Sequence, residues 1–465
     1  MTTPDAPTPV HDVPEQRVAQ LRERAAALFP GLRADLEALV RIPSVSNAEF
    51  DQAHVDASAA AVAALLEAAG LPAEVLTVTA PDGAVSRPAV IARRPAPAGA
   101  PTVLLYAHHD VQPPGDDADW VTPPFEPTER DGRLYGRGAA DDKAGVVAHL
   151  GALRVLGDEL GVGVTVFVEG EEEIGSPTFT AFLHAHRDEL AADVIVVADS
   201  SNWAIGTPGL TTSLRGLVDC EVEVAVLDHA IHSGMYGGPV LDAPTLLARL
   251  VATLHDENGD VAVAGLGAAP DPAVEYDEAT FRADAGVLDG VRLAGTGPIT
   301  ARLWTRPAIG VIGFDAPRVA SASNTITPRA TAKLSLRIPP GQDPAAAMDA
   351  LRAHLLAHAP FGARVEVRDG EAGQPFQAPQ DSDGMRAARW AFAQAWGSAP
   401  VDIGIGGSIP FIAELLELYP DASILVTGVE DPDGRAHGAN ESVHLGELRN
   451  VVLAEALLLE RLARR

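Results

Sequence analysis

Residues 103–110 read VLLYAHHD, an apolar run that leads directly into two histidines and an aspartate. The same pattern occurs twice more along the chain. The run VTVFV at 164–168 leads into Glu169, and the run VIVVA at 194–198 leads into Asp199. Short apolar runs of this kind are typical of strands that are buried on both faces of a sheet.

Helical stretches, expected at about 143–157 and 178–190, separate these apolar runs. Apolar strands that alternate with helices predict a mostly parallel α/β sheet covered on both faces. In open sheets of this type, ligands bind beyond the carboxyl ends of the strands. Acidic and imidazole side chains crowded there would repel one another unless they bind metal. The sequence therefore predicts a metal site at this edge of the sheet.

The pattern changes after about Thr207, where residues 216–226 alternate between apolar and polar as a half-exposed strand does. Further strands are expected at 308–314, 331–338 and 363–369, with helices at 242–256 and 344–358 and a long loop-like excursion at 257–300. This β-α-β-β-α-β order fits a small ferredoxin-like, split βαβ domain. We therefore predict an α/β catalytic domain, residues 1–206 and 376–465, interrupted by an inserted α+β domain at 207–375.

Bulk properties exclude several classes of protein. The 465 residues are too many for one hydrophobic core, which supports two domains. A net charge of −30 repels nucleic acid and anionic lipid, so neither is expected as a partner. The single cysteine, Cys220, sits in an alternating strand-like stretch and is expected to be a buried core thiol. With neither a signal-peptide pattern nor an apolar run of transmembrane length, we expect a cytoplasmic location.

Two more clusters contain candidate metal ligands. GRGAADDKAG (136–145) places Asp141 and Asp142 just before a predicted helix, where either one could instead be an N-cap. GRAHGANESVH (434–444) places His437 in a glycine-rich loop, where a lone histidine is usually only solvated. Neither cluster identifies a site by itself.

Seven segments together resemble the M20 metallopeptidase family, and in particular its carnosinase and cytosolic dipeptidase branch. In order, they are HHDVQP (108–113), GRGAADDKAG (136–145), EGEEEIGS (169–176), VVADSSNW (196–203), HSGMYGG (232–238), GGSIP (406–410) and AHGANE (436–441). The resemblance extends over about residues 30–460. One such motif is weak evidence, whereas seven in the same order are specific.

The resemblance implies a site with two metal ions. His108 and Asp199 would hold the first ion, Glu173 and His437 the second, and Asp141 would bridge the two. Zinc is the metal that the family implies, although a nitrogen and oxygen ligand set without thiolate also suits cobalt or manganese. Two such ions share a water and lower its pKa.

The resemblance also assigns supporting roles beside the metals. Asp110 would accept a hydrogen bond from the His108 imidazole, and Glu172 would be the general base that activates the metal-bridging water. The Asp141–Asp142 peptide bond is expected to be cis. A strand-end cap is the alternative for Asp110, and a solvated turn is the alternative for the acidic run.

Residues of the inserted domain and of the GGSIP segment are expected to contact the substrate. In the family, the counterpart of His232 crosses a dimer interface and stabilises the oxyanion in the partner subunit. Arg337 would bind the substrate carboxylate, and Asn324, Ser408 and Gly407 would lie around the scissile amide. A surface histidine and a strand-surface charge are the alternatives for His232 and Arg337.

One position departs from the family pattern. Gly404 and Ile405 stand where carnosinase-like relatives often carry Arg-Glu, and Ile405 cannot balance the ammonium group of a dipeptide. The leading hypothesis is a zinc-dependent dipeptidase that forms a homodimer through the inserted lid domain. The alternatives are a deacylase that acts on N-acyl amino acids and a non-catalytic metal-binding protein.

Overall fold

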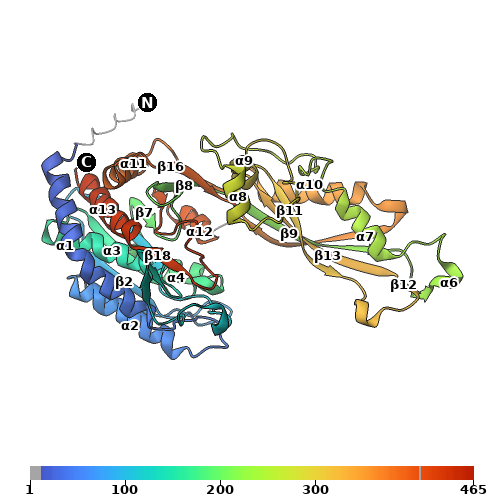
Figure 1. The fold of residues 1–465 in the computed structure, drawn as a ribbon, viewed down its shortest axis with the longest axis horizontal. Helices are drawn as coiled ribbons and strands as arrows, with labels where there is room; N and C mark the ends of the chain where they lie inside the picture. Colours follow the sequence, from blue (N-terminus) through green and yellow to red (C-terminus); the bar gives the residue numbers. More distant parts are fainter. Residues whose placement is uncertain (1–11, 408–409, 465) are drawn as a thin grey trace. The chain divides into compact units, whose positions relative to one another are not determined.

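The computed structural model describes residues 12–407 and 410–464, which divide into two compact units (Figure 1). The first unit comprises Met1–Thr212, Ala378–Asp402 and Glu414–Arg465, and the second comprises Ser213–Gln377 and Ile403–Ala413. The sequence placed the domain boundaries after residues 206 and 375. The contacts of the chain divide it after residues 212 and 377, and they also group residues 403–413 with the second unit.

The first unit is built on a mostly parallel sheet, as the apolar runs predicted. Its central strands are parallel and lie in the order β6 (Gly163–Glu169), β3 (Thr102–His108), β7 (Val194–Val197) and β17 (Ser423–Val426). Antiparallel strands flank them, namely β2 (Ala89–Arg94) and β1 (Ala73–Leu76) beside β6, and β8 (Gly209–Leu214) beside β17. The three apolar runs at 103–107, 164–168 and 194–198 correspond to β3, β6 and β7.

Helices cover this sheet, and α3 is the most deeply buried of them. The long helices are α1 (Glu15–Val40), α2 (Ala53–Ala68), α3 (Lys143–Leu156), α11 (Asp383–Trp396) and α13 (Leu445–Leu462). In α3 every residue except Arg154 is buried, because the helix contacts α1, α13 and β3 (Figure 1). A helix that is surrounded by other elements in this way needs apolar residues on almost all of its faces.

A small three-stranded sheet brings two loops of the first unit together. It contains β4 (Thr128–Arg130), β5 (Arg133–Tyr135) and β18 (Ser442–His444), in the order β18-β5-β4. Ser442 of β18 pairs with Tyr135 of β5, and just beyond them the Gly136 amide donates to the Glu441 carbonyl at 3.0 Å. The segment after β5 therefore lies against the segment before β18.

The second unit has the β-α-β-β-α-β order that the sequence predicted. Its elements follow as β9 (Gly216–Ala225), α7 (Ala243–Ala252), β11 (Ala308–Asp315), β13 (Arg329–Ile338), α10 (Pro344–Ala357) and β14 (Arg364–Gly373). The strands form an antiparallel sheet in the order β11-β13-β9-β14, so the first and third strands of the unit lie at its centre. This is the ferredoxin-like arrangement.

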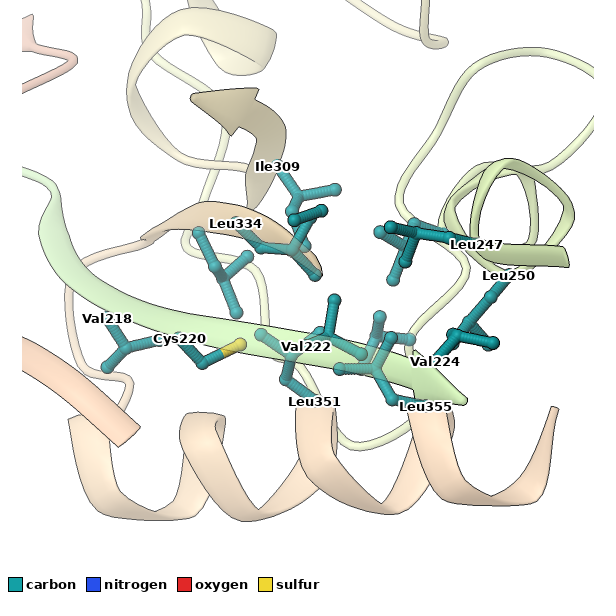
Figure 2. Packing of buried hydrophobic residues seen from close by; sticks show 14 of the residues in the cluster. Val218, Cys220, Val222, Val224, Leu247, Leu250, Ile309, Leu334, Leu351 and Leu355 are labelled. Carbon is teal, nitrogen blue, oxygen red and sulfur yellow. The ribbon is translucent and has the colours of Figure 1, made fainter. Parts of the chain in front are cut away.

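One face of this sheet forms the core of the second unit. Figure 2 shows Val222 and Val224 of β9 facing Leu351 and Leu355 of α10, with Leu247 of α7 nearby. Alternate residues of β9 point to this face, as period-two patterning requires. Cys220 lies in the same cluster and is fully buried, which confirms the prediction of a core thiol (Figure 2).

Some local predictions were incomplete. The stretch 257–300 was expected to be loop, but it contains α8 (Glu278–Asp284), which begins where the Asp277 carboxylate accepts a hydrogen bond from the Thr280 amide at 3.0 Å. The helix expected at 178–190 is two short helices, α4 (Phe179–Ala185) and α5 (Arg187–Leu190), separated at His186. Among the described residues, none of the helices combines the length and the apolar character that crossing a membrane needs.

Candidate metal centre

The carboxyl ends of β3, β6 and β7 bring three predicted side chains together. His108 ends β3, Glu172 follows β6 in a single 3-10 turn, and Asp199 follows β7. One ligand atom from each of these residues lies within 4.8 Å of the others. Neighbouring parallel strands end at one edge of the sheet, so apolar runs far apart in the sequence deliver these groups to one place.

A second group joins Asp141, Glu173 and His437, again with ligand atoms within 4.8 Å of one another. The Nε2 atom of His437 lies 3.3 Å from Oε2 of Glu173 and 2.9 Å from Oδ2 of Asp141. The other oxygen of Asp141, Oδ1, lies 3.0 Å from Nε2 of His108. The carboxylate of Asp141 thus reaches one histidine of each group.

Asp142, the neighbour of Asp141, has a different role. Its carboxylate caps α3 by accepting a hydrogen bond from the Gly145 amide at 3.2 Å, and its second oxygen accepts one from the His108 amide at 3.2 Å. The N-cap alternative therefore applies to Asp142, whereas Asp141 faces the two histidines. The peptide bond between Asp141 and Asp142 is cis, as expected.

Asp110 contacts both candidate groups. Its Oδ1 atom lies 3.4 Å from Nδ1 of His108, and its carbonyl oxygen lies 3.1 Å from the same nitrogen. Its carboxylate also accepts hydrogen bonds from the backbone amides of Glu172 and Glu173, at 3.2 and 3.1 Å. Asp110 is fully buried, so it orients the His108 ring and fixes the turn that bears both glutamates.

Gln112 is a residue that the sequence analysis did not single out. Its side-chain amide donates to Oε2 of Glu173 at 2.7 Å and to the Glu173 carbonyl at 3.1 Å. Its backbone amide donates to Oε1 of Glu173 at 3.0 Å. The only available signal was the position of Gln112 within HHDVQP, because Glu173 lies 61 positions away in the sequence.

The acidic run after β6 consists of carboxylates with different surroundings. Glu169 accepts a hydrogen bond from the Tyr106 hydroxyl at 2.7 Å, and Glu171 accepts from the Arg87 and Thr178 amides at 3.0 and 2.9 Å. Both side chains are buried, which rules out the solvated-turn alternative for them. Within the described part of the chain, the Glu172 carboxylate has no hydrogen-bond donor.

The site is crowded with carboxylates. Burial, together with the nearby charges of Asp199 and Glu173, raises the pKa of Glu172 to about 9, although His108 acts to lower it. Burial likewise raises the pKa of Asp199 to about 6 and that of Glu173 to about 7. Divalent cations would supply the missing positive charge, and imidazole nitrogen with carboxylate oxygen is a donor set that holds them. The residues therefore fit a metal cofactor.

Two of the predicted substrate contacts adjoin each other in the second unit. His232 pairs with Thr325 in a two-stranded antiparallel sheet of β10 (Ile231–His232) and β12 (Thr325–Ile326), and the Ser233 amide donates to the Asn324 carbonyl at 3.0 Å. His232 and Asn324 are both exposed. The imidazole Nδ1 of His232 accepts a hydrogen bond from the Gly234 amide at 3.0 Å. This bond leaves Nε2 as the donor that an oxyanion would need.

Arg337, in β13 of the same unit, has a neighbour that the sequence analysis missed. Arg215 lies just before β9, and its guanidinium donates to the carbonyls of Gly406, Arg302 and Arg306 at 3.0, 3.3 and 3.4 Å. Burial and the charge of Arg337 lower the pKa of Arg215 to about 10. Neither arginine forms a salt bridge with a carboxylate among the described residues. A pair of guanidinium groups without an acid partner favours an anionic ligand.

The glycine-rich segment of the second unit is only partly described. Gly407 is half-buried and follows Gly406, whose carbonyl Arg215 binds. A Cβ atom at Gly406 would lie 2.7 Å from Nη2 of Arg215, so a larger residue there would displace the guanidinium. Ser408 lies outside the described residues.

Comparisons with known proteins agree with this geometry. A profile described as "Peptidase family M20/M25/M40" matches residues 104–461. A cysteinylglycine-S-conjugate dipeptidase from Corynebacterium striatum is 40% identical over 370 residues, which cover 77% of this chain and 81% of that protein. The human Beta-Ala-His dipeptidase is 28% identical over 361 residues, which cover 74% and 71% of the two chains. The crystal structure of human carnosine dipeptidase 1 superposes with a TM-score of 0.76 at 25% identity and covers 96% of this chain and 99% of that one.

Proposed function

This chain belongs to peptidase family M20/M25/M40, and from that membership we propose that it is a dipeptidase whose activity depends on two metal ions. The observation that carries the proposal is the paired ligand groups joined by the Asp141 carboxylate, whose two oxygens lie 3.0 Å from His108 and 2.9 Å from His437. If the His108 and His437 groups were two separate ion pairs, they would not need to share the Asp141 carboxylate. A shared carboxylate is what a site for two neighbouring ions would require.

In this proposal His108 and Asp199 would hold one ion, Glu173 and His437 would hold the other, and Asp141 would be a ligand of both. Zinc is the proposed metal, and cobalt or manganese fits the same donor set. When bound, two such ions polarise a scissile carbonyl and make water more acidic. The protein residues around the ligands would then hold the ligand side chains in position.

Glu172 is proposed as the general base. It would take a proton from the attacking water and return it to the nitrogen of the leaving amine. Two observations support this role. The Glu172 carboxylate lies beside His108 and Asp199 with ligand atoms within 4.8 Å, and no donor among the described residues occupies it. Glu169 and Glu171 accept other hydrogen bonds and are less available for proton transfer.

The proposed substrate is a small dipeptide with a free carboxylate. Arg337, with the neighbouring Arg215, would bind that carboxylate, and a planar guanidinium suits it because two N–H groups can bind two oxygens. Asn324, Gly407 and Ser408 would contact the scissile amide. His232 would donate to the oxyanion across a homodimer formed by the second unit, an assignment that rests on the family resemblance.

The relative that is 40% identical is named a cysteinylglycine-S-conjugate dipeptidase. We therefore propose S-conjugates of cysteinylglycine as the first dipeptides to test. Ile405 bears on this choice because it is half-buried at the end of β16 (Val401–Ile405) and carries no charge. An apolar residue beside the substrate would favour an apolar S-substituent over a second charge.

Ile405 also keeps one alternative open. A site without an acid at this position suits a substrate whose amine is acylated, and the same metal chemistry would then remove the acyl group from an N-acyl amino acid. Both reactions hydrolyse an amide next to a carboxylate. They differ in whether a free ammonium group must be balanced.

A cytoplasmic location, which the sequence suggested, is part of the proposal as well.

A hydrolysis screen distinguishes these two substrates. The protein is stripped of metal, reconstituted with zinc, and given free dipeptides, cysteinylglycine S-conjugates and N-acetyl amino acids in parallel. Cleavage of the free dipeptides supports the proposal. Cleavage of the N-acetyl amino acids alone would make the protein a deacylase, and no cleavage of either class with two ions bound would contradict both.

A further inference from the structure

Glu441, just before β18, is a fully buried carboxylate that the proposed mechanism does not use. Its oxygens accept hydrogen bonds from several donors. Oε2 accepts from the Arg137 guanidinium at 2.7 Å and from the Gly138 amide at 3.0 Å. Oε1 accepts from the amides of Ala140 and Asp141, at 2.9 and 3.1 Å. The segment 138–141 is therefore wrapped around one carboxylate.

Arg137, the charged partner of Glu441, extends this network to two further segments. It is 1% exposed, and its Nη2 atom donates to the carbonyl of His437 at 3.2 Å and to the carbonyl of Pro113 at 3.3 Å. The ion pair thus contacts the loop that carries His437, the segment that ends in Asp141, and the loop that follows the 108–110 cluster. In the sequence, His437 is 300 positions from Arg137, whereas Pro113 is 24 positions away.

The chemistry of these contacts makes Glu441 hard to replace. A carboxylate can accept several hydrogen bonds at once, whereas a glutamine amide turns one oxygen into a donor that would face backbone N–H groups. Hydrogen bonds to a charged group contribute more than neutral ones do, and removing one partner of a buried ion pair leaves the other uncompensated. Changing Glu441 would therefore release the 138–141 segment.

The two candidate ligand groups depend on this segment unequally. Asp141 belongs to the group with Glu173 and His437, and both the Asp141 amide and the His437 carbonyl are held by the Glu441–Arg137 pair. The other group consists of His108, Glu172 and Asp199. Among the described residues, neither Glu441 nor Arg137 forms a hydrogen bond or ion pair with the side chains of that group, which the network reaches only through the Asp141 carboxylate, 3.0 Å from Nε2 of His108.

We propose that Glu441 is a positioning residue that, through Arg137 and the 138–141 backbone, sets the affinity of the ion held by Asp141, Glu173 and His437. The inference rests on the proposed two-ion site. Outer residues that orient metal ligands typically change metal affinity by about 10- to 100-fold. An effect of that size on this ion, with a smaller effect on the ion that shares only Asp141 with the network, is the signature of positioning.

The test is a cobalt titration of metal-stripped protein, followed by visible absorption and calorimetry, for wild type and Glu441→Gln. The expected result is that Glu441→Gln binds one ion about 10- to 100-fold more weakly than wild type and the other with a clearly smaller loss of affinity. Arg137→Lys is a second variant, because it keeps the charge beside Glu441 and shortens the reach to the His437 and Pro113 carbonyls. It replaces Glu441→Gln if that variant does not fold.

Glu455→Gln is the matched control. Glu455 is also a buried carboxylate with a charged partner, 2.9 Å from Nδ1 of His149, but it lies on α13 and contacts neither ligand group. It should lower the melting temperature and leave both affinities unchanged. Equal weakening of both ions by Glu441→Gln would indicate a purely structural role, and two unchanged affinities would also overturn the inference. Fewer than two ions in wild type would instead contradict the proposed function.

Discussion

At the scale of single residues, neighbouring carboxylates differ in chemistry because their hydrogen-bond donors differ. Glu169 is bound by the Tyr106 hydroxyl, Glu171 by backbone amides and Glu173 by Gln112. Glu172 stands in the same run without such a donor among the described residues. A carboxylate that must take and return a proton needs to be free of competing donors. The hydrogen-bond donors around each carboxylate therefore distinguish the proposed base, Glu172, from the proposed ligand, Glu173. They also distinguish both from Glu169 and Glu171, whose hydrogen bonds hold the local structure.

The reactivity of the Cys220 thiol can be used to measure how often the core of the second unit opens. It is the chain's only cysteine, it is fully buried, and burial, followed by the charges of Asp219 and Asp369, raises its pKa to about 12. Leu334 pairs with it across the central strands. Leu334→Ala should lower the stability of this core by about 2–5 kcal/mol, since it leaves a cavity.

Thiol labelling measures this effect directly. If labelling requires the core to open, its rate in Leu334→Ala should rise by roughly 30- to 4,000-fold, the factor that corresponds to that free energy. Val311→Ala is the control, because Val311 is 43% exposed on the edge strand β11. Equal labelling rates in wild type and Leu334→Ala would show that Cys220 is reached without opening of the core.

At the scale of elements, α3 and α13 are joined by a buried ion pair. Nδ1 of His149 on α3 lies 2.9 Å from the Glu455 carboxylate on α13, and Nε2 lies 3.0 Å from the Tyr106 carbonyl of β3. Both neighbours are acceptors, so only the protonated imidazole satisfies both. Burial alone would lower the pKa of His149, but Glu455 and the Tyr106 carbonyl raise it above its ordinary value.

This pair predicts a pH-dependent stability. A raised histidine pKa in the folded state stabilises the protein fully below the unfolded pKa of about 6.5, and that stabilisation is lost as pH rises through the folded pKa. Glu455→Gln removes the cause of the raised pKa. The free energy of unfolding should therefore differ more between wild type and Glu455→Gln at pH 6 than at pH 9, as measured by urea denaturation. A difference that grows with pH would contradict a charged His149.

The strands and helices that periodicity could identify are those with strong local patterns. The apolar runs that form β3, β6 and β7 and the alternation of β9 were visible in the sequence because burial on two faces or on one face dictates them. The helix α8 and the break between α4 and α5 were not, because a capping aspartate and a local turn decide them. Tertiary hydrogen bonds from distant segments, such as those of Gln112 and Glu441, have no periodic signal at all.

At the scale of the whole molecule, the residues proposed for the activity are divided between the two units. The candidate metal ligands lie in the first unit, whereas the proposed substrate contacts His232, Asn324 and Arg337 lie in the second. The sequence predicted the candidate ligand set only through its resemblance to a family, since spacing alone left an N-cap and a solvated histidine as alternatives.

Co-expression of two inactive variants tests the proposed sharing of sites between subunits. In a homodimer with His232 acting across the interface, a mixed dimer of Glu172→Gln and His232→Ala has one intact site. Random pairing should then restore about a quarter of the wild-type activity, because half of the dimers are mixed and each has one working site. Each variant expressed alone is the control. Activity no higher than that of the two separate variants would mean that every site is self-contained.

The most direct test of the proposed mechanism is to measure bound zinc and turnover on the same samples of wild type and Glu172→Gln, with a cysteinylglycine S-conjugate as substrate. We expect two ions per chain in both proteins and a loss of about 100- to 10,000-fold in kcat for the variant, the usual contribution of a general base. Wild-type turnover by Glu172→Gln with both ions bound would contradict it.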